Sequence, residues 1–134
     1  MATTILATEI ADLRQQRRDT RRELARVRWW RRLVRARRDL AVAFIADPIG
    51  AGSAGLDLSW EALAAGAPTS SELADAVWPE AEASSVAALE SLDDLDTRLA
   101  AYEARVVATL DSVTGQMVRA MARAHTVETE EEEA

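Results

Sequence analysis

The chain has 134 residues and a formal net charge of −7, and its 16 basic residues are all arginine. The absence of cysteine excludes disulfides and thiolate chemistry, and a single histidine, His125, does not supply the several ligands that a metal site needs. The first residues lack a signal-peptide pattern and no stretch approaches the roughly 20 apolar residues of a membrane span, so we expect a cytoplasmic protein without membrane contact.

A first long helix is predicted over residues 5–46, which contain no glycine or proline and end before Pro48. Counting from Ile10 in alternate steps of three and four residues gives a heptad seam that arginines interrupt. The seam consists of Ile10, Leu13, Arg17, Thr20, Leu24, Val27, Arg31, Val34, Arg38, Ala41 and Ile45, and it is widened on one side by Trp30, Leu33, Leu40 and Phe44. Each seam arginine requires a partner, because desolvating an unpaired charge is costly.

An irregular connection is predicted over residues 47–83, where "GAGSAG" indicates a flexible linker. Short helical turns are expected within it, and Thr69 with Glu72 forms a capping-box pattern for one of them. Large aromatic side chains are normally buried where the fold allows. We therefore expect Trp60 and Trp78 to pack back over the tip of a helical hairpin.

A second long helix is predicted over residues 84–124, followed by an acidic tail, 125–134, that is expected to be disordered. Its predicted seam is Leu92, Leu95, Leu99, Tyr102, Val106, Thr109, Val113, Gln116 and Ala120, with Leu110, Met117 and Met121 alongside. Two helices of similar length favour an all-α, antiparallel two-helix coiled-coil hairpin, with residues 1–124 as a single domain. Because two helices cannot bury two wide stripes, either a homodimer or a protein partner is expected on the open face.

Charge is divided sharply between the two halves: residues 1–46 carry +7 and residues 47–134 carry −14. Nine of the arginines lie within residues 21–43, together with Trp29 and Trp30. One interpretation is that they form salt bridges across the hairpin with Asp93, Asp94, Asp96 and Glu103. A second follows from Arg28, Arg31, Arg35 and Asp39, which share one helix face and have the chemistry to bind a guanine nucleotide.

The segment "RWWRRLVRARRDL" resembles the first helix of RsiG-type anti-sigma factors of actinobacteria, and "LDSVTGQMVRAMAR" resembles their second. The family signature is Glu, Ser, Arg, Gln and Asp with gaps of three, two, three and three residues, once on each helix. In the first copy Arg31 and Asp39 match, while Leu24, Arg28 and Arg35 occupy the Glu, Ser and Gln places. In the second copy only Asp111 matches, and the other places hold Asp96, Ala100, Glu103 and Val107.

The resemblance implies a helical hairpin that sequesters a sporulation sigma factor of the WhiG type, with cyclic di-GMP as a candidate effector rather than a required cofactor. It assigns the ligand-binding positions to Arg28, Arg31, Arg35, Asp39, Asp96 and Asp111. Because the second copy is degenerate, we hypothesise that Arg28 and Arg35 pair with Asp96 and Glu103 and form the binding-competent shape without ligand. Trp29, Trp30 and Arg32 are then the candidate partner-binding residues.

Two other functions remain open from the sequence. A structural or adaptor coiled coil would self-associate and bind no ligand. A nucleic-acid-binding arginine helix would contact phosphates, but the acidic second half disfavours that interpretation. An enzyme is not expected, because the chain shows no nucleophile–base pair and no glycine-rich phosphate loop.

Overall fold

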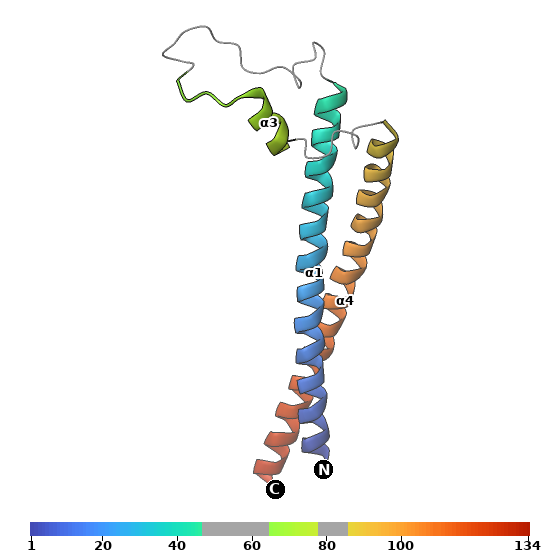
Figure 1. Cartoon of the computed structure of the whole chain (residues 1–134). Coiled ribbons are helices and arrows are strands. Elements are labelled where there is room, and N and C mark those ends of the chain that lie inside the picture. The colour runs from blue at the N-terminus through green and yellow to red at the C-terminus, as the bar shows by residue number, and fades with distance from the viewer. Residues whose placement is uncertain (47–64, 78–85) are drawn as a thin grey trace. The chain divides into compact units, whose positions relative to one another are not determined.

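The computed structural model describes residues 1–46, 65–77 and 86–134, and all elements in these ranges are helices (Figure 1). They are α1 (Ala2–Ile45), α3 (Ser70–Val77) and α4 (Val86–Glu133). The predicted all-α class is confirmed. The contacts of the chain divide into two compact units, Met1–Arg32 with Thr97–Ala134 and Leu33–Asp96.

The seam predicted for α1 is the buried stripe of that helix. Five of its apolar positions are buried, and these are Leu13, Leu24, Val27, Val34 and Ala41. The seam arginines Arg17, Arg31 and Arg38 are half-buried, whereas Ile45 at the end of the helix is exposed. Of the four residues expected to widen the seam, Leu40 is half-buried, whereas Trp30, Leu33 and Phe44 are exposed, so the stripe is narrower than predicted.

The seam of α4 differs from the prediction in its phase. Three predicted positions are buried, namely Val106, Val113 and Ala120. The residues that alternate with these positions along the stripe were predicted to be Leu95, Tyr102, Thr109 and Gln116, which are exposed. Instead they are the half-buried residues Asp96, Glu103, Leu110 and Met117. Counted from Val106, the buried and half-buried positions of α4 therefore follow each other in steps of four and then three residues, where steps of three and then four were predicted. Leu110 and Met117 are more apolar than Thr109 and Gln116, and Glu103 supplies a carboxylate to the half-buried guanidinium of Arg31.

The first unit pairs the beginning of α1 with the end of α4. A small apolar cluster is formed by Leu13, Val113 and Ala120, against which Ile10 and Met117 pack. Polar contacts link the same two helix segments. Arg123 Nη2 donates to Glu9 Oε1 at 2.8 Å, Arg17 Nε donates to Thr114 Oγ1 at 3.2 Å, and Tyr102 Oη donates to Glu23 Oε1 at 3.0 Å.

The capping box predicted before α3 is present. The backbone N–H of Thr69 donates to Glu72 Oε2 at 2.9 Å, and the backbone N–H of Glu72 donates to Thr69 Oγ1 at 3.2 Å. Just before it, Gly66 has φ of 76°, a left-handed conformation that glycine adopts without steric cost. The expected burial of Trp60 and Trp78 concerns positions outside the described residues.

The end of α4 also differs from the prediction, because the helix does not stop near Ala124 but continues through the acidic segment to Glu133. Glutamate is a strong helix former, and no glycine or proline interrupts this part of the chain. The hydroxyl of Thr126 donates to the carbonyl of Ala122 at 3.0 Å, and that of Thr129 donates to the carbonyl of His125 at 2.8 Å. The tail is thus a helical extension of the first unit rather than a disordered segment.

Candidate interaction site

Glu103 is held by two arginines of α1, and we call these three residues the Glu103 clamp. Arg28 Nε donates to Glu103 Oε1 at 2.9 Å, and Arg31 Nη1 donates to the other carboxylate oxygen, Oε2. The side chains of Arg31 and Glu103 are each only 18% exposed. The hydrogen bonds from Arg28 and then Arg31 hold the pKa of Glu103 below its ordinary value. The carboxylate is therefore charged and paired at neutral pH.

Two further ion pairs lie in the second unit. Arg35 Nε is 3.5 Å from Asp96 Oδ1, and Arg38 Nε donates to Asp93 Oδ1. The hydrogen bond to Asp93 raises the pKa of Arg38, so this pair is also charged. Together with the Glu103 clamp, these contacts confirm the expected pairing of Arg28 and Arg35 with acidic residues of α4.

The candidate nucleotide-binding residues are therefore divided among separate arrangements. Arg28 and Arg31 belong to the Glu103 clamp, and Arg35 pairs with Asp96. Asp39, in the second unit, and Asp111, in the first, are both exposed. The guanidinium groups that the resemblance assigns to a ligand thus bind carboxylates of the chain itself.

The candidate partner-binding residues lie on the outer face of α1 in the first unit. The rings of Trp29 and Trp30 meet edge to face, with centroids 4.9 Å apart and planes inclined by 72°. Trp29 is 48% exposed and Trp30 is 54% exposed, and Arg32 beside them is exposed as well. Two large aromatic side chains in contact with solvent are typical of a surface that binds another protein.

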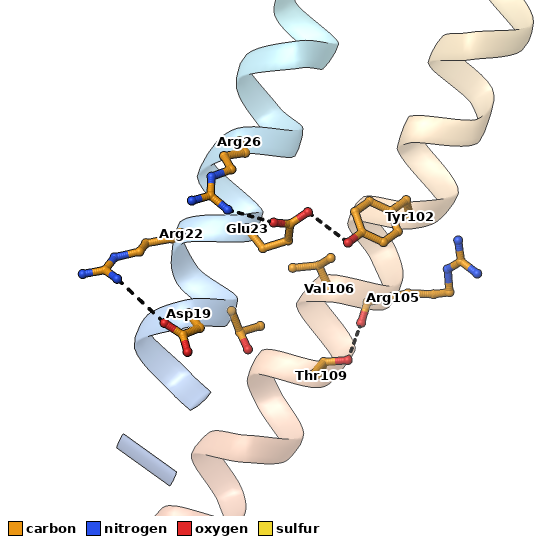
Figure 2. A pocket seen from close by; sticks show the side chains of 9 residues that line it. Asp19, Arg22, Glu23, Arg26, Tyr102, Arg105, Val106 and Thr109 are labelled. Atoms are coloured by element: carbon orange, nitrogen blue, oxygen red, sulfur yellow. Dashed lines mark hydrogen bonds and ion pairs between the residues drawn. The ribbon is translucent and has the colours of Figure 1, made fainter. Parts of the chain in front are cut away.

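A groove that the sequence did not reveal lies between α1 and α4 in the first unit (Figure 2). It has a volume of about 670 Å³ and is lined by Asp19, Thr20, Arg22, Glu23, Arg26, Tyr102, Arg105, Val106 and Thr109. Sequence reasoning missed it because Tyr102 was placed inside the seam. The available signal was the pair Tyr102 and Arg105, which stand three residues apart and so share a face of α4.

The arginines of this groove differ from those of the Glu103 clamp in their partners. Arg22 Nη1 is 3.7 Å from Asp19, and Arg26 Nη1 is 3.4 Å from Glu23, both within α1. The Arg105 guanidinium carbon lies 5.6 Å from the centroid of the Tyr102 ring. The hydrogen bond that Tyr102 donates to Glu23 raises the pKa of the phenol, which stays neutral.

In the part of the chain that the structure describes, no group of three or more metal-ligating side chains comes together. Within the same residues, no helix combines the length and the apolar character needed to cross a membrane. Comparison of the chain with protein-family models, with curated proteins and with solved structures finds no match.

Proposed function

We propose that this protein is a cytoplasmic transcriptional regulator that acts by binding another protein, like the RsiG-type anti-sigma factors that its arginine-rich helix resembles. The proposed partner is a sigma factor of the WhiG type, and binding does not require cyclic di-GMP. One contrast carries the proposal. Arg28 and Arg31, two of the candidate nucleotide-binding residues, are paired with the carboxylate of Glu103, whereas the adjacent tryptophans Trp29 and Trp30 are exposed.

Independence from the nucleotide follows from the Glu103 clamp. A phosphate group binding at Arg28 and Arg31 would have to displace a carboxylate that both guanidiniums already bind. It would also meet the negative charge of Glu103 at close range. The clamp links the two helix segments of the first unit, as a nucleotide bound between the two helices would. A state formed without ligand needs no effector to be populated.

The helical arrangement proposed for this function is an antiparallel hairpin of α1 and α4. Contacts inside each unit support it. Glu9 with Arg123 and Glu23 with Tyr102 in the first unit follow an antiparallel order, as do Arg35 with Asp96 and Arg38 with Asp93 in the second. Such a hairpin presents one continuous face of each helix to a partner.

The test is a binding titration of the purified full chain with a purified WhiG-type sigma factor, with and without cyclic di-GMP. We expect the same affinity in both conditions. Trp29→Ala and Trp30→Ala should each weaken binding by about 30-fold or more, because aromatic residues that anchor an interface contribute about 2 kcal/mol or more. The matched control is Val118→Ala, which removes part of a 58% exposed apolar side chain from α4.

The same titration includes a variant of the clamp. Glu103→Arg places arginine where the family signature has it and removes the carboxylate that opposes a phosphate. We expect this variant to bind cyclic di-GMP more tightly than the parent chain. If the parent chain binds the sigma factor only with cyclic di-GMP, the ligand-independent mechanism is wrong.

A second candidate function is self-association, which a separate set of residues favours. In the second unit, α1 exposes the large apolar side chains Leu33 and Phe44, which stand eleven residues apart on one helix face and are each 42% accessible. A coiled coil that dimerises would cover such a row. Sedimentation of the chain alone decides this, since a dimer that Leu33→Ser and Phe44→Ser convert to a monomer would favour the adaptor function.

A further inference from the structure

The surface that extends the tryptophan pair toward the groove has a chemistry that indicates its partner. Arg26 lines the groove, and Trp30 stands four residues later in α1 on the same helix face. The groove and the tryptophan pair are therefore parts of one continuous strip in the first unit. We call the groove residues Arg22, Arg26, Tyr102 and Arg105, together with Trp30, the aromatic–arginine strip.

The strip combines an apolar floor with a cationic rim. Val106 at the floor is buried, and Tyr102 forms a wall that is 37% exposed (Figure 2). The side chains of Arg22 and Arg26 are 67% and 69% exposed, and their ion pairs are local contacts within one helix. Local pairs of this kind contribute little and rearrange readily, so the guanidiniums are available to an incoming carboxylate.

The wider surface of the same helix segment has the same sign of charge. Exposed arginines also flank the strip on α1 of the first unit, namely Arg18, Arg21 and Arg32. The exposed acids of that segment are Asp12 and Asp19. The positive potential therefore favours a partner surface rich in carboxylates.

The residues that line the groove favour a helix over a small anion. Asp19 and Glu23 line the groove and would repel a phosphate held deep inside it. An amphipathic helix instead inserts an apolar side chain over Val106 and beside Tyr102, and keeps its carboxylates at the rim. This arrangement is the helix-in-groove mode of recognition, and it completes a three-helix bundle from two helices.

We infer that the aromatic–arginine strip is the docking site for an acidic amphipathic helix of the partner protein. The inference rests on the proposed function only in that the partner is a protein. The apolar stripe of that helix lies in the groove, its carboxylates bind Arg22, Arg26 and Arg105, and its end reaches Trp30.

The experiment is a calorimetric titration of the full chain with a synthetic peptide of about three heptads, with leucine at the a and d positions and glutamate at e and g. We expect saturable binding. The double variant Arg22→Glu with Arg105→Glu should weaken it by about tenfold or more, as should Tyr102→Ala. The matched control is Arg14→Glu with Arg119→Glu, which reverses one exposed arginine on each helix outside the groove and should change the affinity by less than about twofold.

Four results would overturn the inference. They are equal loss in the control double variant, undiminished binding in the groove variants, displacement of the peptide by inorganic phosphate or cyclic di-GMP, and a homodimer that the groove variants dissociate. Circular dichroism of each variant verifies that the helices are intact.

Titration with the sigma factor separates the two proposals. If the peptide binds at the strip but the sigma factor does not bind, the proposed function fails and the strip stands. If the groove variants bind the sigma factor as tightly as the parent chain does, the docking role of the strip is wrong and the proposed function stands.

Discussion

The first unit contains two layers of contact between the same two helices, and they differ in chemistry. The apolar layer is formed by Leu13, Val113 and Ala120, with Ile10 and Met117 packed against them. The ionic layer is the Glu103 clamp, in which Arg28 and Arg31 bind one carboxylate. Apolar side chains pack in several registers at similar free energy, whereas a half-buried carboxylate between two guanidiniums is satisfied in one. The apolar layer thus supplies stability, and the ionic layer selects which face of α4 meets α1.

The largest expected effect is on the apolar layer. Leu13→Ala should lower the free energy of unfolding by about 2–4 kcal/mol, because it removes a buried side chain and leaves a cavity. Chemical denaturation followed by circular dichroism measures the change. Ile5→Ala is the matched control, since Ile5 lies on the same helix but is 64% exposed. Equal losses from the two substitutions would show that the cluster around Leu13 is not a core.

A smaller effect is expected in the ionic layer, and it depends on pH. Arg28 and Arg31 hold the pKa of Glu103 below its ordinary value of 4.5. The stabilisation is therefore fully present above pH 4.5 and is lost as the pH falls through the lower folded-state pKa. Glu103→Gln should reduce the melting temperature at pH 7 and flatten the acid side of its pH profile.

The control for the ionic layer is Asp111→Asn, which neutralises an exposed carboxylate on the same helix. It should leave the acid side of the profile close to that of the parent chain. An unchanged profile in Glu103→Gln would mean that the clamp does not contribute to folding, and the division between the two layers would then be abandoned.

The smallest expected effect is a gain in stability within α4, next to the apolar layer. Gly115 lies inside α4, where a Cβ would meet only the guanidinium of Arg119, at 3.5 Å. Gly115→Ala should therefore raise the free energy of unfolding by about 0.5–1 kcal/mol, through the higher helix propensity of alanine. Urea unfolding measures it. A loss of stability instead would indicate that another chain approaches α4 closely at this glycine in solution.

Much of the local structure was predictable from the sequence, because it depends on neighbours along the chain. The run without glycine or proline before Pro48 predicted α1, and Thr69 with Glu72 predicted the start of α3. The buried stripe of α1 was also predictable from its heptad spacing. The continuation of α4 to Glu133 was missed, because the acidic composition was given more weight than the helix propensity of glutamate.

The candidate site was predictable only in part. The sequence indicated that the arginines of α1 meet acids of the second half, and the pairs Arg28 with Glu103 and Arg35 with Asp96 agree with that expectation. It did not indicate that Tyr102 would form the wall of a groove. That outcome depends on the rotation of α4 about its axis, which no residue of α4 specifies alone.

What the sequence determined by itself was therefore the set of helices and the buried stripe of α1. The tertiary structure decided the face of α4. Two seams were compatible with its heptads, one containing Leu95 and Tyr102 and the other containing Asp96 and Glu103. Hydrophobicity favours the first seam at Leu95 and Tyr102 but the second seam at Leu110 and Met117, which replace Thr109 and Gln116, so it does not select one seam for the whole helix. Pairing with Arg31 selects the second, because a half-buried guanidinium left without a carboxylate costs more than the exposure of one leucine and one tyrosine.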